Sequence, residues 1–262
     1  MQYMISKSSD GTIKITFKEG FVSVIIPTID EKYAVCVSSQ LGCPVGCSFC
    51  FTGKRGFKRN LTKEEMMKQI ETVMTIIGKI PNSVVFMGMG EPTLNLENVL
   101  EAAEEIHKKY SIAYVRITIS TSCLKNLNKL LNIPFNLALS VHSVDEKTRK
   151  KIMPKSVSTK TILNFANKYF KIHPKKYLMI EYALMKGIND SEKDIEKLTK
   201  IKWPKRTLFN FIQFNEIGKF KQVNIERMRE FKQAMRDAGY KAFIRQNRGS
   251  DIKAACGMLD YK

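Results

Sequence analysis

The stretch that decides the fold of this chain is CVSSQLGCPVGCSFC, residues 36–50. Its last three cysteines, Cys43, Cys47 and Cys50, are separated by three and by two residues. Three thiolates at this spacing fit on one tight loop, and Gly42 and Gly46 let the backbone curl. Such a set suits a cubane iron–sulfur cluster that keeps one iron open for a substrate. The stretch therefore predicts a metal-binding loop directly after a short strand at Ala34–Val37.

The distribution of the cysteines leaves one alternative open. The chain has six, and four of them fall within fifteen residues, which is not how a disulfide framework spreads over a protein of this size. Clustered cysteines indicate metal ligands or catalytic thiols. A zinc site with Cys36 as the fourth ligand fits the spacing as well as an iron–sulfur cluster does.

Outward from this loop, apolar runs alternate with amphipathic segments. The predicted strands are Ala34–Val37, Ser83–Met87, Val115–Ile119, Leu137–Val141, Tyr177–Leu184, Leu208–Phe214 and Ala242–Arg245. The predicted helices begin after the cap Thr62, cover about Leu96–Lys109, Leu124–Leu131 and Thr159–Ile172, begin again after the cap Ser191, and end with Ile225–Ala238. Roughly six βα units in a row predict an α/β fold, with a parallel sheet, open or closed into a full or partial barrel, and helices outside. In such barrels the chemistry lies at the carboxyl ends of the strands.

The N-terminal 30 residues predict a small β unit. Ile13, Ile15 and Phe17 alternate with polar residues, a turn follows, and Phe21–Ile26 forms a second apolar run. We expect residues 1–30 to be a small β extension and residues 31–262 to be one catalytic unit. A length of 262 residues allows one or two domains.

Composition and charge narrow the class of partner. The chain has 44 Lys and Arg against 25 Asp and Glu, a net charge of +19, which favours a polyanion, nucleic acid before membrane. A merely solvated basic surface is the alternative. A hydrophobic content of 44% excludes wholesale disorder. No apolar run reaches the roughly 18 residues of a membrane span, and the start lacks a signal-peptide core, so we expect a cytoplasmic protein with no membrane partner.

A second motif, GMGEP at residues 88–92, follows the strand Ser83–Met87. Its glycines allow close backbone approach, and Glu91 can accept a bond from a ligand ammonium group. Together with the cysteine loop, the motif resembles the radical S-adenosylmethionine (SAM) enzymes. That resemblance implies a radical SAM partial (β/α)6-type TIM barrel.

The resemblance narrows to the RlmN/Cfr-type RNA adenine methyltransferases and extends from about Phe21 to Leu259. The matching pieces are CVSSQLGC at 36–43, GFKRNL at 56–61, GMGEP at 88–92, STS at 120–122, LSVH at 139–142, Asn215, and RGSDIKAACG at 248–257. The resemblance implies that Cys43, Cys47 and Cys50 hold a 4Fe–4S cluster. It also implies SAM contacts at Gly90, Glu91, Ser120, Ser140, Val141, His142 and Asn215, although a histidine at a strand end is as often structural.

The same resemblance assigns the two remaining cysteines of interest. Cys256 would accept a methyl group from one SAM, and a radical made from a second SAM would take a hydrogen from it. The resulting methylene radical would add to adenine, and Cys36 would help release the product, leaving a disulfide. An electron donor such as flavodoxin or ferredoxin is implied. Without the resemblance, both cysteines are ordinary small buried residues.

Basic clusters near the predicted catalytic loops favour an RNA path. One follows the cysteine loop and comprises Lys54, Arg55, Lys58 and Arg59; the other comprises Lys147, Arg149, Lys150, Lys151 and Lys155. Phosphate contacts at such residues give affinity without sequence information. We expect an adenine of rRNA or tRNA as substrate, at carbon-2 or carbon-8.

Two departures from the family bear on the substrate. The chain has no room for the N-terminal accessory domain that grips RNA, so a separate RNA-binding partner could replace it. Val22 stands where the family commonly has a glutamate proposed as proton acceptor. Two alternatives follow: a radical SAM enzyme of the same mechanism acting on a non-RNA substrate, and a zinc-containing RNA-binding protein.

Overall fold

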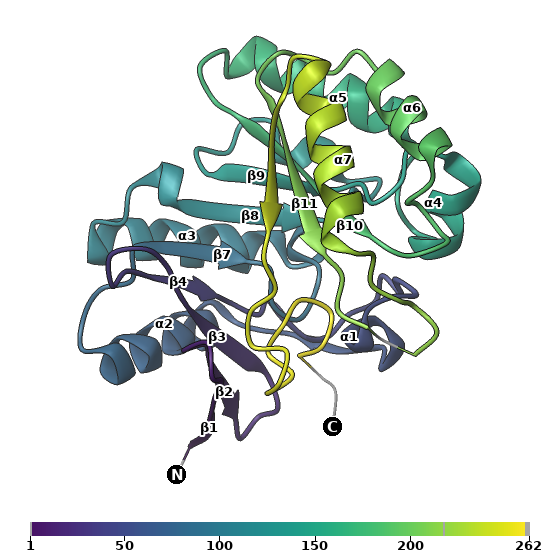
Figure 1. Ribbon diagram of the computed structural model, residues 1–262. Coiled ribbons are helices and arrows are strands. Elements are labelled where there is room, and N and C mark those ends of the chain that lie inside the picture. Colours follow the sequence, from purple (N-terminus) through teal and green to yellow (C-terminus); the bar gives the residue numbers. More distant parts are fainter. Residues whose placement is uncertain (1, 217, 260–262) are drawn as a thin grey trace.

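The apolar runs of the sequence form a ten-stranded mixed sheet in the computed structural model, which describes residues 2–216 and 218–259 (Figure 1). The order is β1-β2-β3-β4-β7-β8-β9-β10-β11-β12. These strands are β1 (Tyr3–Lys7), β2 (Ile13–Phe17), β3 (Val22–Pro27), β4 (Tyr33–Cys36), β7 (Ser83–Phe86), β8 (Ile117–Thr121), β9 (Asn136–Ser140), β10 (Leu178–Leu184), β11 (Thr207–Gln213) and β12 (Lys241–Arg245). A separate hairpin pairs β5 (Gln40–Gly42) with β6 (Phe57–Asn60).

The sheet changes direction at β4. Strands β1 to β4 pair antiparallel, and β4 and β7 to β12 pair parallel. Seven parallel strands therefore end on the same side of the molecule. Within the described residues β1 and β12 are the two edges of the sheet, so the α/β architecture expected from the sequence is present as an open arrangement.

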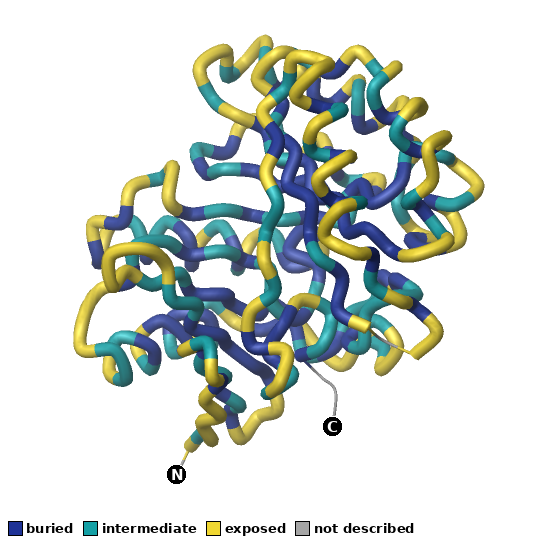
Figure 2. The backbone as a smooth tube through the Cα atoms, viewed as in Figure 1, coloured by how far each residue is buried: buried dark blue, intermediate teal, exposed yellow. Residues whose placement is uncertain are grey.

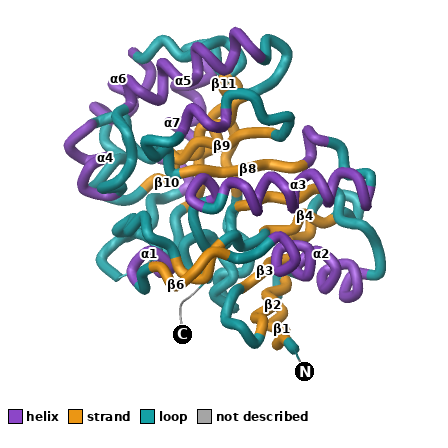
Figure 3. Tube along the Cα trace, turned by 180° about the vertical axis from the view of Figure 1, so that it is seen from behind, coloured by secondary structure: helices purple, strands orange, loops and turns teal. Residues whose placement is uncertain are grey.

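The crossover segments carry the helices. They are α1 (Phe51–Lys54), α2 (Lys63–Ile77), α3 (Leu96–Tyr110), α4 (Glu146–Ile152), α5 (Thr159–Ile172), α6 (Glu192–Lys200) and α7 (Ile225–Asp237), with short 3₁₀ turns η1 (Pro92–Leu94), η2 (Tyr114–Arg116) and η3 (Leu127–Leu130). The caps predicted from the sequence are present: Thr62 forms a capping box with Glu65, and Ser191 forms one with Asp194. Each box satisfies two backbone donors at a helix start. Seen from behind, α3 runs alongside β8, and α2 lies next to β4 (Figure 3).

The core lies between the parallel strands and these helices. Strands β10 and β11 are mostly buried, whereas β1, at one edge of the sheet, is largely exposed (Figure 2). Tyr182, Phe209 and Phe211 are fully buried, and Tyr182 and Phe211 pack edge to face at 5.9 Å. No helix of the residues described here is long and apolar enough to cross a membrane.

One predicted helix is wrong, and several short elements, β1 (Tyr3–Lys7) among them, were missed. The segment Leu124–Leu131 contains only η3, because its buried leucines Leu124, Leu127 and Leu130 repeat every three residues, which matches a 3₁₀ period. The hairpin β5–β6 and the short helices α1 and α4 were not predicted. They are too short for periodicity to reveal.

The segment after β12, residues 246–259, has no regular structure and turns back toward the N-terminal strands (Figure 1). Ala254 and Leu259 pack in one apolar cluster with Val22, Val24 and Cys36. The apolar side chain of Val22 is buried, and no carboxylate stands at this position. The whole division into residues 1–30 and 31–262 stays a prediction, since strands β1–β3 continue the main sheet.

Candidate active site

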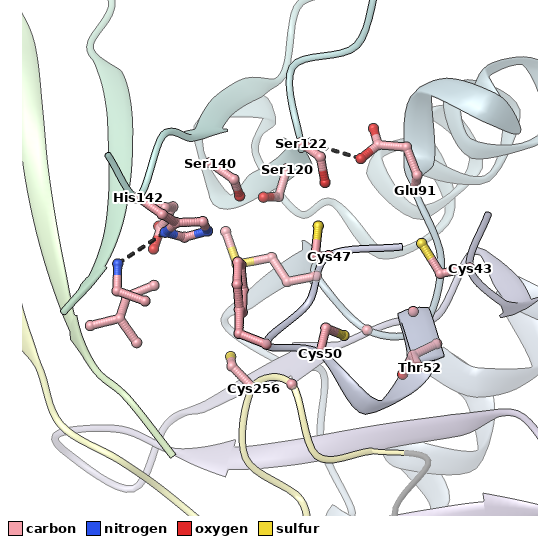
Figure 4. A pocket seen from close by; sticks show the side chains of 18 of the residues that line it. Cys43, Cys47, Cys50, Thr52, Glu91, Ser120, Ser122, Ser140, His142 and Cys256 are labelled. Atoms are coloured by element: carbon pink, nitrogen blue, oxygen red, sulfur yellow. Dashed lines mark hydrogen bonds between the residues drawn. The ribbon is translucent and has the colours of Figure 1, made fainter. Parts of the chain in front are cut away.

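The carboxyl ends of the parallel strands surround one cavity, and most residues singled out in the sequence line it. The lining includes Cys43, Cys47, Cys50, Gly90, Glu91, Ser120, Ser140, His142, Asn215 and Cys256. In Figure 4, Ser120, Ser140 and His142 lie along one side, and Cys50 and Cys256 lie on the other. Val141 is not on this lining: its side chain is fully buried in the core.

The cysteine loop is held by backbone hydrogen bonds at both ends. Cys43 N–H donates to Gly56 O at 2.9 Å, and Cys50 N–H donates to Cys47 O at 3.1 Å. Gly42 has φ +79°, and a Cβ there would lie 2.0 Å from Gly56 O. The loop therefore needs glycine at Gly42 to close against the β5–β6 hairpin.

The three thiols of the loop fit a cationic iron–sulfur cluster. Burial raises the pKa of Cys43 to about 12, and it also raises the pKa of Cys47 and Cys50. Their proximity adds to this, since each thiolate opposes ionisation of the next. Among the described residues no His, Cys, Asp or Glu trio is already set in metal-binding geometry. A bound metal centre would supply the positive charge that stabilises three neighbouring thiolates.

Glu91 joins the GMGEP loop to the end of β8. Its Oε1 accepts from Thr121 Oγ1 at 2.6 Å and from Thr93 Oγ1 at 2.7 Å. Its Oε2 accepts from Ser122 N–H at 2.7 Å. The carboxylate is 1% exposed and keeps lone-pair capacity on Oε2 for a further donor.

The glycines of this loop are required by protein contacts. A Cβ on Gly88 would lie 2.7 Å from Ser38 Oγ, and one on Gly90 would lie 2.6 Å from the Gln40 side chain. Gln40 Oε1 accepts from Glu91 N–H at 2.8 Å, and buried Gln69 of α2 bonds both the N–H and the carbonyl of Ser38. The sequence reasoning expected close approach at these glycines but missed the polar partners, Gln40 and Gln69.

His142 is oriented by its neighbours on β10. Its Nδ1 accepts from Ala183 N–H at 2.9 Å, which leaves the proton of a neutral ring on Nε2. Burial lowers the pKa of His142 to about 3, and the positive charges of Arg149 and Arg245 lower it further. The Phe49 ring lies edge-on at 5.0 Å. The structure thus provides a neutral imidazole at the cavity wall.

Cys256 and Cys36 lie beside a second cavity next to the first. This cavity is lined by Val24, Ile26, Cys36, Val85, Met87, Ile212, Arg245, Gln246, Asn247, Arg248, Ala254, Ala255, Cys256 and Leu259. Cys256 lines both cavities, whereas Cys36 lines the second. Burial raises the pKa of Cys36 to about 12, but Cys256 is exposed. Cys123 is buried and lines neither cavity.

Three polar residues at this site were missed from the sequence. Arg245 Nη2 lies 2.9 Å from Cys256 Sγ, and its Nη1 lies 3.8 Å from Glu181 Oε2. Asn210 Nδ2 donates to both oxygens of Glu181 at 3.1 Å. The available signal was a carboxylate inside the apolar strand run LMIEYAL, residues 178–184, because buried charges are rare without a partner.

The two basic clusters differ from expectation in one member. Arg149 is 1% exposed and donates to the backbone carbonyls of Val141 and Val157, so it holds the β9 loop and cannot meet RNA. Lys155 donates to Pro44 O in the cysteine loop. The remaining basic residues of both clusters are exposed: Lys54, Arg55, Lys58, Arg59, Lys147, Lys150 and Lys151.

Comparison with known sequences agrees with this site. The pattern of the Radical SAM superfamily matches residues 37–199. A dual-specificity RNA methyltransferase RlmN of Desulfotalea psychrophila is 36% identical over 98% of this chain and 76% of its own length. The protein of the same name from Campylobacter hominis is 39% identical over 98% of this chain and 79% of its own length.

Solved structures agree on the fold. A radical SAM methyltransferase from Sphaerobacter thermophilus superposes with a TM-score of 0.88 at 31% identity, covering 98% of this chain and 81% of that one. A spore photoproduct lyase superposes with a TM-score of 0.55 at 12% identity, which shows a shared fold alone.

Proposed function

Since this chain belongs to the RlmN family of radical SAM RNA methyltransferases, we propose that it methylates a ring carbon of an adenine base in RNA through a methyl group carried on Cys256. The observation that carries this proposal is the placement of Cys256 on the wall shared by two cavities. A thiol there can accept a methyl group from one side and present it to a base on the other.

The first cavity has the residues to hold the cofactors of the family. Cys43, Cys47 and Cys50 would ligate a 4Fe–4S cluster, and Glu91 would accept from the SAM ammonium group. A bound cluster would supply an open iron for the SAM donor atoms and the electron needed for SAM cleavage. The remaining proposed SAM contacts are Gly90, Ser120, Ser140, His142 and Asn215, together with Val141 through its backbone, because its side chain lies in the core.

The residues of this chain divide the work between the two cysteines. Cys256 is exposed, and its sulfur accepts a hydrogen bond from the guanidinium of Arg245. The sulfur is therefore available as a nucleophile. Cys36 is buried in the second cavity, and burial raises its pKa to about 12. We assign Cys256 as the methyl carrier and Cys36 as the thiol that releases the product, forming a disulfide with Cys256.

The second cavity suits a flat base. Its lining includes the apolar side chains of Val24, Ile26, Val85 and Met87 and the polar side chains of residues 245–248. A base extruded from an RNA would find a packing surface there. The exposed basic residues of α1, β6 and α4 would contact phosphates. The substrate would be rRNA, tRNA or both, and the modified atom carbon-2 or carbon-8.

Metal analysis tests the cofactor assignment. After anaerobic reconstitution, the wild-type protein should contain iron and sulfide with a 4Fe–4S absorption spectrum, and replacing Cys47 by Ala should abolish it. Stoichiometric zinc without that spectrum would instead support a zinc-containing RNA-binding protein.

Trapping the substrate tests the reaction. A Cys36→Ala variant, given SAM, reductant and total RNA, should accumulate a covalent RNA adduct at Cys256, since the thiol that resolves it is gone. Cys123→Ala removes a buried cysteine that lines neither cavity and should release product normally. An adduct with a non-RNA molecule would identify a different substrate for the same mechanism. If Cys36→Ala formed no more adduct than Cys123→Ala, the carrier role of Cys256 would be overturned.

The assay also addresses partners. If the purified chain methylates RNA only after a cell-extract fraction is added, this result would support a separate RNA-binding protein that helps the chain to bind RNA. Flavodoxin and ferredoxin are proposed as electron donors and can be compared directly against a chemical reductant. We further propose that residues 31–262 are the catalytic unit, that residues 1–30 extend it, and that the protein acts in the cytoplasm.

A further inference from the structure

The segment that carries Cys256 has few bonds of its own. Residues 246–259 form neither helix nor strand. Phe51 N–H donates to Gly257 O at 2.8 Å, which ties the segment to the cysteine loop, and Asn215 Nδ2 donates to Cys256 O at 3.3 Å. These two contacts fix the C-terminal side of Cys256, so its N-terminal side needs another anchor.

That anchor comes from the turn between β1 and β2, together with Lys14 of β2, whose Nζ donates to Lys253 O at 3.2 Å. Asp10 Oδ2 accepts from Gly249 N–H at 2.9 Å, while its Oδ1 accepts from Thr12 N–H at 2.9 Å. Ser8 Oγ donates to Asp251 Oδ1 at 2.6 Å, and Ser9 N–H donates to the other oxygen at 3.2 Å. One carboxylate from the β1–β2 turn and one from residues 246–259 thus accept hydrogen bonds across the contact between these two segments.

The fit between turn and segment is close. Gly249 is buried at φ +65°, and a Cβ on it would lie 2.8 Å from both Thr12 Cγ2 and Ala254 Cβ. Ala254 N–H donates to Gly249 O at 2.8 Å. The hydrogen bond from Gly249 to Asp10 therefore anchors a tight loop, residues 249–254. This loop ends two residues before Cys256.

Electrostatics show that the Asp10 carboxylate is engaged as an anion. Partial burial would raise its pKa, but hydrogen bonds from Thr12 and Gly249 outweigh this and lower the pKa to about 2. Asp10 is ionised at any pH at which the enzyme would work. Hydrogen bonds to an ionised acceptor are roughly twice as strong as neutral ones.

We propose that Asp10, through Gly249, is a positioning residue that sets the place of Cys256 between the two cavities, and that the β1–β2 turn acts as a latch for the carrier segment. This inference rests on the proposed function of Cys256 as methyl carrier. The N-terminal strands then contribute to catalysis, because they form the surface against which the carrier thiol is positioned.

The test compares Asp10→Ala with Asp10→Asn, which retains one side-chain oxygen acceptor. Glu19→Ala is the matched control, because Glu19 lies in the next turn and pairs with Lys68 at 2.9 Å, away from the segment. Hydrogen exchange at the Gly249 and Ala254 amides should accelerate about tenfold in Asp10→Ala, the change expected on losing a bond to a charged acceptor. It should accelerate less in Asp10→Asn and stay unchanged in Glu19→Ala.

The second readout separates the latch from a general loss of structure. With SAM and reductant, the ratio of methylated Cys256 to SAM cleaved should fall several-fold in Asp10→Ala, while total cleavage and cluster absorption stay at the wild-type level. Asp10→Asn should restore part of the ratio. Equal loss of cleavage and methylation would show a merely structural role.

Should Asp10→Ala fold poorly, Ser8→Ala breaks the second contact of the latch and should change exchange and ratio in the same direction. Wild-type exchange in both variants would overturn the latch. Absence of Cys256 methylation in the wild type would overturn the proposed function, and the amide exchange would still decide whether the turn holds the segment.

Discussion

Arg245 is the residue whose removal tests the polar chemistry of the site most directly. Its guanidinium lies between Glu181 at 3.8 Å and the sulfur of Cys256 at 2.9 Å. The perturbation is Arg245→Met, which keeps much of the side-chain volume and removes the charge. Among the described residues, Glu181, 3% exposed, would then keep the amide of Asn210 as the polar partner of its carboxylate.

The size of the effect follows from the geometry. Two unit charges at this distance attract by about 4 kcal/mol at an effective dielectric constant near 20. The Arg245 side chain is 31% exposed, so solvent screens part of this, and we expect a loss of about 2 kcal/mol in the free energy of unfolding. Glu181→Gln should lose about 1 kcal/mol, because the arginine left behind can be hydrated.

The assay is urea unfolding of the metal-free protein, followed by circular dichroism under reducing conditions, for the wild type, both single variants and the double variant. The double variant should be more stable than the sum of the single losses predicts, by about 1 kcal/mol or more. Coupling below about 0.5 kcal/mol, the usual spread for independent sites, would refute the account of Arg245 as the partner of a buried carboxylate.

Three further predictions follow from single residues. The pKa of His142 is about 3 in the folded protein, below its ordinary value of 6.5, so between these pH values the unfolded chain binds one proton more than the folded chain. The free energy of unfolding should therefore fall as the pH drops below 6.5, by about 1 to 2 kcal/mol at pH 5. The fall should be smaller in His142→Gln. Cys36, with its pKa raised to about 12 by burial, should resist iodoacetamide at pH 8 until urea unfolds the chain; rapid labelling of the folded protein would contradict this. Gly90→Ala should destabilise by more than about 2 kcal/mol through its clash with Gln40, whereas Gly187→Ala, at φ +71° with open space around it, should lose only about 1 kcal/mol in thermal or urea unfolding.

The parts of the site that the sequence predicts are those with a local signal. The spacing of Cys43, Cys47 and Cys50 follows from loop closure, and Glu91 is marked by glycines after an apolar run. Arg245 and Glu181 escaped because they meet only when β10 and β12 lie in one sheet. No spacing along the chain encodes that meeting.

The fold shows the same division. Long amphipathic helices such as Leu96–Tyr110 were predicted almost to the residue, since fifteen positions give a clear period. Arg149 was grouped with surface lysines, although its side chain turns inward to bond the carbonyl of Val141. Charge alone does not tell a solvated arginine from one that satisfies buried backbone oxygens.

The contact between Asp10 and Gly249 joins positions 239 residues apart, and this has a consequence for biosynthesis. At about 5–20 residues per second, the segment that bonds Asp10 emerges from a ribosome roughly ten to fifty seconds after the turn itself. The cysteine loop and the strands around it can fold during that interval. A nascent chain would therefore be able to form its cysteine loop before the contact between Asp10 and Gly249 closes.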